Sequence, residues 1–144
     1  MKTLTTKKVF IVICWNGLRS IPPREFPTIG ELEQTAKILD LFAEPIPEFI
    51  EVFEEGEKLN TDILTKKYDE KEIQEKRTEY LNKSNLLEIK AGDEIVEIEF
   101  EDAEFNTFFQ QFERWGKNWF FKLSAYLEFR KDLNATNSQP KEKE

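Results

Sequence analysis

One stretch, residues 94–133, constrains the fold more than any other part of the chain. It opens with the alternating run Glu-Ile-Val-Glu-Ile-Glu-Phe-Glu, and 11 of the chain's 19 Phe, Trp and Tyr residues lie within residues 100–130. Strict alternation is typical of a strand with one buried face, whereas apolar residues three and four apart are typical of a helix. We therefore predict that a strand followed by aromatic helices supplies most of the core.

The alternating run places apolar and acidic side chains on opposite faces of the strand. The apolar face contains Val96, Ile98 and Phe100, and the acidic face contains Glu97, Glu99 and Glu101. We predict that residues 86–90 pair with this strand as a β-hairpin. Two interpretations of the carboxylates stay open: a docking surface for a basic partner, or a solvated face whose charge discourages aggregation.

The aromatic part that follows has helical spacing. Phenylalanines stand at positions i, i+3, i+4 and i+7, namely Phe105, Phe108, Phe109 and Phe112. This spacing places them on one side of a helix that begins near residue 103, with Asp102 as its N-cap. Gly116 either bends one long helix or separates two helices.

A second apolar stripe is expected farther along the same aromatic part. It is formed by Phe121 and Phe129, beside Trp119. A helix that is apolar on more than one side is either sandwiched inside the fold or contacts another molecule. Because Trp is favoured at interfaces, we name all three residues as candidate partner-binding residues and keep both alternatives.

The N-terminal part contains one continuous apolar run, residues 9–15 (Val-Phe-Ile-Val-Ile-Cys-Trp). Its β-branched residues favour a buried strand. Asn16-Gly17 favours a hairpin turn, and residues 18–21 are predicted to return as a short strand. We expect residues 9–21 and 86–100 to form one small antiparallel sheet.

The middle of the chain is helical and charged. Thr28 and Glu31 form a capping pattern before a helix of residues 29–43, and Pro47 suits the first turn of the next helix. That helix either continues through residue 68 or restarts at a second capping pattern, Asp69 to Glu72. Residues 47–84 carry a thin apolar stripe, which predicts a helical arm packed on one side only. The complete prediction is one mainly helical α+β domain, residues 1–134, in which the sheet packs against an aromatic C-terminal helix pair. Residues 135–144 are predicted to be a disordered tail.

The composition argues against most catalytic chemistry. The chain has no histidine and one cysteine, Cys14, so Ser/His and Cys/His catalytic pairs and an internal disulfide are excluded. Its five glycines are scattered and form no phosphate-binding loop. We predict a protein that is not an enzyme and has no cofactor and no metal.

The charge is concentrated in two acidic blocks. The net charge is −8, with nine acidic and two basic residues in residues 28–58 and eight acidic and one basic residue in residues 88–104. Direct nucleic-acid binding is disfavoured because it needs a basic surface. No apolar stretch is long enough to span a bilayer, so we predict no membrane association and a cytoplasmic location.

The passage from strand to helix also supports a resemblance. Residues 96–105 (Val-Glu-Ile-Glu-Phe-Glu-Asp-Ala-Glu-Phe), followed by a final aromatic helix pair, resemble small accessory proteins of tailed bacteriophages. The likeness covers residues 86–134. It implies either an accessory of virion assembly or an inhibitor of a host system, and the cytoplasm would then be that of the host cell.

These observations favour a non-enzymatic protein that acts by contact with another protein or with itself. In the first hypothesis it is an inhibitor or decoy that uses Glu97, Glu99 and Glu101 to occupy a basic, nucleic-acid-binding host complex. In the alternative it is a structural or assembly subunit of a virion or multi-protein complex, and it uses the apolar face of Phe121 and Phe129.

Overall fold

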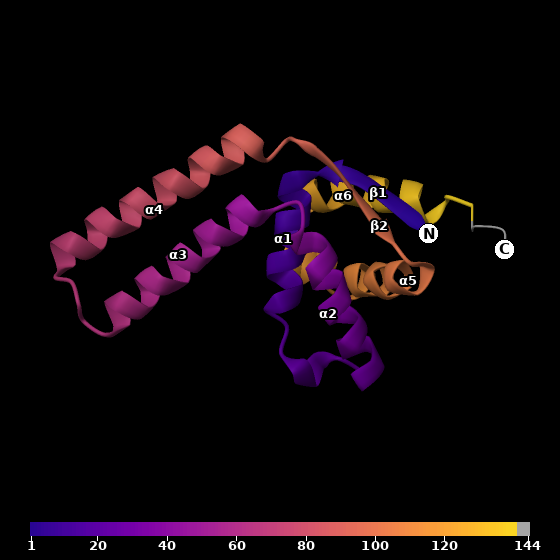
Figure 1. Cartoon of the computed structure of the whole chain (residues 1–144), viewed down its shortest axis with the longest axis horizontal. Helices are drawn as coiled ribbons and strands as arrows, with labels where there is room; N and C mark the ends of the chain where they lie inside the picture. The colour runs from indigo at the N-terminus through magenta and orange to yellow at the C-terminus, as the bar shows by residue number, and fades with distance from the viewer. Residues whose placement is uncertain (141–144) are drawn as a thin grey trace.

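The protein consists of a small helical body and a projecting helical arm (Figure 1). The computed structural model describes residues 1–140, apart from the side chain of Trp119. In chain order the elements are β1 (Lys2–Lys7), α1 (Lys8–Arg19), the 3₁₀ helix η1 (Pro23–Glu25), α2 (Ile29–Ala43), α3 (Pro47–Leu64), α4 (Glu70–Ala91), β2 (Ile95–Phe100), α5 (Asp102–Gln111), the π-helix η2 (Phe112–Phe120) and α6 (Leu123–Asn137).

The predicted fold class is confirmed. The chain is mainly helical, and its one sheet has two antiparallel strands, β1 and β2. β1 packs against α6 and β2 packs against α5, so the sheet lies against the aromatic C-terminal helices as expected. The register pairs Lys2 with Phe100, Leu4 with Ile98 and Thr6 with Val96.

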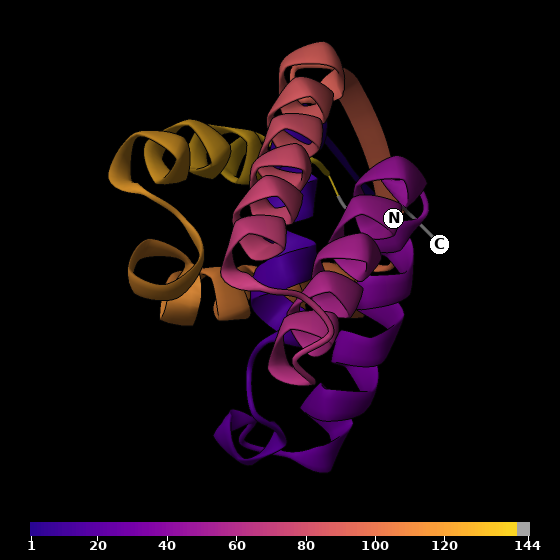
Figure 2. The same ribbon diagram turned by 90° about the vertical axis from the view of Figure 1, so that its left-hand side faces the viewer.

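The predicted strand of residues 9–15 is wrong, because these residues belong to α1. A short apolar run buried on all sides has no periodicity that separates strand from helix. When the run is extended to residue 18, its four most buried apolar residues nevertheless have helical spacing: Phe10, Ile11, Cys14 and Leu18. Figure 2 shows α1 in the middle of the body, and it contacts both α2 and η2.

Asn16-Gly17 lies inside α1 rather than in a hairpin turn, and residues 18–21 form no strand. Gly17 is required for a different reason. A Cβ atom at this position would lie 2.3 Å from Cδ1 of Phe120, so the glycine lets the ring from η2 lie directly against the α1 backbone. The Asn16-Gly17 pair, which was interpreted as a turn, therefore marks a place where two helices pack closely.

The strand that pairs with β2 is β1, and residues 86–90 are the end of α4 instead. The segment that forms β1, Lys-Thr-Leu-Thr-Thr-Lys, contains one apolar residue and was not predicted to be a strand. Its burial alternates nonetheless, with Lys2, Leu4 and Thr6 buried. Lys2 is accommodated because its ammonium donates to the carbonyl oxygen of Asn137 at 2.8 Å.

Two of the predicted helix starts are confirmed by their caps. The Thr28 hydroxyl accepts a hydrogen bond from the Glu31 N–H at 3.0 Å, and the Asp69 carboxylate accepts one from the Glu72 N–H at 2.9 Å. At α5 the predicted cap is shifted by one residue. Glu101 is the N-cap, and its N–H donates to the Glu104 carboxylate at 3.0 Å.

Aromatic rings fill the core between the sheet and the helices. Phe100 from β2 lies edge-on to Phe42 from α2, with ring centroids 5.9 Å apart, and Phe42 lies edge-on to Phe108 from α5 at 4.9 Å. Phe129 from α6 completes the cluster beside Phe108 at 6.4 Å. These rings come from four elements, α2, β2, α5 and α6, so the cluster holds the body together.

Residues 102–134 form two helical segments, and Gly116 does not separate them. The π-helix η2 continues α5 without a break, and two extended residues, Phe121 and Lys122, separate it from α6. A π-helix accommodates the crowded ring of Phe112, which would lie 2.7 Å from a Cβ atom at position 116. Gly116 therefore permits close packing within the turn instead of ending it.

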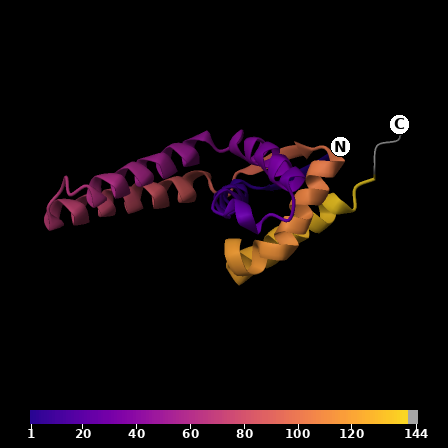
Figure 3. The ribbon, with the colours of Figure 1, turned by 90° about the horizontal axis from the view of Figure 1, so that it is seen from below.

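The charged arm is the hairpin of α3 and α4, which lie side by side and extend away from the body (Figure 3). Ala91 is the one buried residue of α4, so this helix is solvated along its length, as predicted for the arm. At the root of the arm the Lys8 ammonium lies 2.7 Å from the Glu48 carboxylate and 2.9 Å from the Glu94 carboxylate.

The prediction that a disordered tail begins at residue 135 is also wrong, as far as the structure describes the chain. α6 continues to Asn137, and Thr136 is buried. The Gln139 side chain then forms two hydrogen bonds with the backbone of Thr3. Polar composition suggested disorder, but these polar groups have partners in β1. Residues 141–144, the rest of the predicted tail, lie outside the described part.

Candidate protein-binding site

The carboxylates predicted to be on the solvent face of the strand are on that face. Glu97 and Glu99 on β2 are exposed, and Glu101 is exposed at the start of α5. The opposite face carries the buried side chains of Ile98 and Phe100. Alternation in the sequence was sufficient for this result because it fixes which side chains share a face.

A groove of about 520 Å³ lies beside this strand, between β2 and the C-terminal end of α2. Its lining residues are Met1, Leu41, Glu44, Pro45, Glu97, Ile98 and Glu99. Three of them are carboxylates, and none is a lysine or arginine. Leu41, Glu44 and Pro45 were not identified from the sequence. Their place in the groove depends on how α2 packs beside β2, and two helices, α3 and α4, separate these elements in the chain.

No side chain of residues 1–140 neutralises the three carboxylates of the groove. The ion pairs of this part of the chain involve other acidic residues, and the N-terminal ammonium of Met1 lies 3.6 Å from Asp102. Glu44, Glu97 and Glu99 are exposed as well. Within residues 1–140, the groove carboxylates therefore face solvent without a lysine or arginine partner.

The acidic face of α3 differs, because several of its carboxylates have cationic partners. Glu55 lies 2.7 Å from Lys83 of α4, and Glu57 lies 2.6 Å from Arg19 of α1. These pairs join the two arm helices to each other and to the body. The acidic block of residues 28–58 thus contributes to the fold through α3.

The pair at the root of the arm also changes the ionisation of both partners. Burial alone would raise the pKa of the Glu48 carboxyl. The hydrogen bond from Lys8, a backbone hydrogen bond and the charge of Lys8 together outweigh burial and lower that pKa below its ordinary value. The hydrogen bond to Glu48 raises the pKa of Lys8, against the opposing effect of burial. Both groups are therefore charged throughout the neutral range.

The two edges of the sheet are unequal. On β1, the N–H of Thr3 donates to Oε1 of Gln139 at 3.0 Å, and Nε2 of Gln139 donates to the carbonyl oxygen of Thr3 at 2.7 Å. This side chain occupies the outer edge of β1, and α6 lies along the same strand. Within residues 1–140, β2 has no second neighbouring strand, and its outer edge faces the groove.

Phe121 and Phe129 are not surface residues, which corrects the prediction that they form an apolar partner-binding face. Phe121 is 6% exposed and Phe129 is fully buried. Phe121 precedes α6, and its ring stacks on Phe129 at 5.2 Å and lies edge-on to Phe10 of α1 at 6.1 Å. The two rings fill the space between α1 and α6. The side chain of Trp119, the third predicted residue, lies outside the described part.

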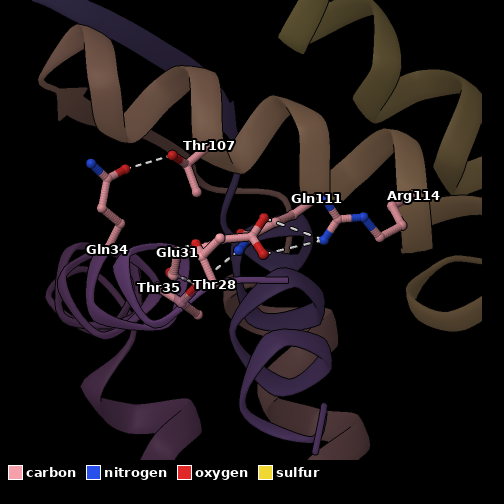
Figure 4. A network of polar contacts seen from close by, with 7 residues as sticks. All are labelled: Thr28, Glu31, Gln34, Thr35, Thr107, Gln111 and Arg114. Atoms are coloured by element: carbon pink, nitrogen blue, oxygen red, sulfur yellow. Dashed lines mark hydrogen bonds and ion pairs between the residues drawn. The ribbon is translucent and has the colours of Figure 1, made fainter. Parts of the chain in front are cut away.

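A separate polar network joins α2 to α5 and η2 (Figure 4). Nε2 of buried Gln111 donates to the Thr35 hydroxyl at 2.7 Å, and Thr107 donates to Oε1 of Gln34. Arg114 of η2 lies 3.2 Å from the Glu31 carboxylate. The network gives most of its polar groups a partner at a helix interface, although the buried Oε1 of Gln111 has none among the described residues. Because unpaired polar groups there are costly, we assign the network a structural role.

Cys14 is not positioned to act as a reactive thiol. Its side chain is fully buried in α1, and burial raises the pKa of the thiol well above its ordinary value. Among the described residues, no three acidic or cysteine side chains are grouped so that they would hold a metal ion.

None of the helices in residues 1–140 combines the length and the apolar character needed to cross a membrane. Comparisons with protein-family models, curated proteins and solved structures found no match.

Proposed function

We propose that this protein is a non-enzymatic binding protein that receives a basic region of another protein in the acidic groove beside β2. In this proposal it is an inhibitor or decoy of a nucleic-acid-binding complex in the cytoplasm, which is that of a host cell if the protein is viral. The observation that carries the proposal is the groove itself, where Glu44, Glu97 and Glu99 are exposed and have no lysine or arginine partner within residues 1–140.

The physical basis is the difference between the two acidic surfaces. A carboxylate already paired within the chain gains little from an incoming lysine, because the new contact replaces an existing one. In the described part of the chain, the groove carboxylates have no such pair with a lysine or arginine to lose. Exposed charges act over about 10 Å at 0.1 M ionic strength, so they attract and orient a basic partner mainly at low salt.

The test uses charge-reversed variants of the protein to capture the partner from native cells, at 50 mM and at 500 mM salt. Glu97→Lys/Glu99→Lys should lose the partner at 50 mM salt while keeping the native melting temperature. The matched control is Glu75→Lys/Glu79→Lys, which makes the same charge change on the exposed face of α4. Equal loss in both variants, or no loss in the first, would contradict a specific acidic groove.

The second candidate function is still an assembly subunit, but residues other than Phe121 and Phe129 would form its contact surface. Exposed leucines occur one helical turn apart on α6, where Leu123 is 61% and Leu127 is 48% exposed. On α4, Leu86 is 66% and Ile89 is 80% exposed. Leu86→Asp/Ile89→Asp and Leu123→Asp/Leu127→Asp should each keep the fold, and loss of self-association in sedimentation by either variant would favour this function.

A further inference from the structure

We propose that the partner enters the groove as an extended strand, which pairs with the open edge of β2 and alternates basic with apolar side chains. This inference rests on the proposed function, because it describes how the basic partner is held. It adds a backbone mode of recognition and a sequence pattern, neither of which follows from charge alone.

The pairing of β1 and β2 fixes which backbone groups are free. In an antiparallel pair, the N–H and C=O of one residue point to the same side, and successive residues alternate between the two sides. The N–H and C=O of Thr3 both point outward, toward Gln139, and not toward β2. Its cross-strand neighbour Glu99 therefore points its own N–H and C=O away from β1. By the same alternation, Glu97 and Ile95 direct their N–H and C=O groups to the outer edge of β2.

A further hydrogen bond supports this assignment of inward-pointing and outward-pointing residues. The N–H of Lys8 donates to the carbonyl oxygen of Glu94 at 2.7 Å. Even-numbered residues of the two strands are thus the ones that form hydrogen bonds across the pair. The odd-numbered residues of β2 are therefore the outward ones. They supply a row of three donors and three acceptors beside the groove.

The contrast between the edges indicates a site for an incoming strand. Proteins usually block exposed strand edges, because an open edge recruits other chains. Here Gln139 and α6 cover the edge of β1, while the edge of β2 adjoins a groove of about 520 Å³. Carboxylates along this edge repel a second acidic strand, and they attract a strand with cationic side chains.

The two sides of the groove define the pattern of the partner. An added strand continues the sheet, so alternate side chains would lie on the outer face next to Glu97 and Glu99. Lysine or arginine is complementary there. The intervening side chains would point toward α2, where Leu41 and Pro45 line the groove. Apolar side chains are complementary there, and Glu44 adds a carboxylate at the rim.

The direct test uses synthetic peptides with the purified full chain in 50 mM salt. The probe is the capped heptapeptide Lys-Val-Lys-Val-Lys-Val-Lys. Two variants carry backbone N-methyl groups, on two of the lysines in one and on two of the valines in the other. In a paired strand only one set of N–H groups faces β2: the lysine set if the added strand is antiparallel, and the valine set if it is parallel.

We expect one N-methylated peptide to bind at least about tenfold more weakly and the other to bind like the parent, because each lost hydrogen bond reduces affinity several-fold. Amide exchange of Glu97 and Glu99 should slow when the parent binds, and that of Ile98 should not change. Equal effects of the two N-methyl sets, or unchanged exchange at Glu97 and Glu99, would overturn strand pairing.

The same experiment separates this inference from the proposed function. If all three peptides bind equally and Glu97→Lys/Glu99→Lys abolishes binding, the charge-driven contact stands and strand pairing falls. If the parent peptide does not bind the native protein at 50 mM salt, both fall. A scrambled peptide of the same composition, Lys-Lys-Val-Val-Val-Lys-Lys, controls for charge without alternation and should bind more weakly than the parent.

Discussion

The side chain of Gln139 pairs with the backbone of Thr3 as a neighbouring strand would, through one donated and one accepted hydrogen bond of 2.7 and 3.0 Å. A single residue beyond α6 thus completes the edge of β1. This relationship explains why a short strand with one apolar residue is held in place. It also gives the sheet one closed edge and one open edge.

Replacing Gln139 by alanine should therefore release the edge of β1. We expect Gln139→Ala to lower the free energy of unfolding by about 1–2 kcal/mol, since two hydrogen bonds are lost. Amide exchange at Thr3 should become faster. Urea denaturation and exchange measurements check these outcomes. Gln110→Ala, an exposed glutamine on α5, is the control, and equal effects of the two changes would contradict the role of Gln139.

Glu48→Gln should weaken the root of the arm in a pH-dependent manner. Because the folded-state pKa of Glu48 is lowered, its carboxylate stabilises the fold above the ordinary pKa of 4.5 and loses this effect as pH falls through the folded-state value. We expect Glu48→Gln to cost about 0.5–1 kcal/mol at pH 7. Denaturation curves across pH should show this difference vanishing in acid.

Lys8→Met tests the other partner at the alkaline end. The folded-state pKa of Lys8 is raised, so its stabilising effect is fully present below the ordinary value of 10.5 and is lost as pH rises through the folded-state value. The difference between Lys8→Met and the native protein should therefore shrink only in strong alkali. A difference that shrinks between pH 6 and 9 would contradict the assignment.

Phe121→Asp should unfold the protein rather than merely stop an assembly. Its ring is buried between Phe129 and Phe112, so the variant would bury an unpaired charge, and we expect a loss of at least about 3 kcal/mol. Leu123→Asp, two residues later and exposed, should stay within about 0.5 kcal/mol of the native stability. A folded Phe121→Asp variant in thermal denaturation would restore the surface interpretation.

Gly17 and Gly30 give a matched pair of alanine substitutions in helices. Gly17→Ala should destabilise by about 1–3 kcal/mol, because its Cβ would collide with the Phe120 ring. Gly30→Ala should stabilise by up to about 1 kcal/mol, since its Cβ meets only the Thr28 hydroxyl at 3.9 Å. Thermal denaturation should give shifts of opposite sign, and shifts of the same sign would contradict the packing argument.

Local patterns in the sequence predicted the parts of the fold that depend on neighbouring residues. Caps at Thr28 and Asp69 and the alternation of β2 depend on spacings of two or three residues, and all three were predicted correctly. The identity of α1 was missed, because an apolar run buried on every side loses the contrast that marks a helix face.

The parts that depend on distant packing were not accessible from the sequence. Phe121 and Phe129 have the spacing of an exposed stripe until α1 is placed against them, and β1 has too few apolar residues to be recognised without β2 and Gln139. In the candidate site, the two strand carboxylates were predicted, whereas Glu44 and the open edge were not. Their place depends on how α2 and β2 lie beside each other.

The bonds between Thr3 and Gln139 span 136 positions of sequence, and this separation has a consequence for how the protein is made. During synthesis β1 leaves the ribosome first but has no partner until β2 and then Gln139 have followed. Contacts this far apart carry a large loop-closure cost, so the sheet should form in one late step. Until that step both strands are open to other chains in the cell, and the groove exists only after it.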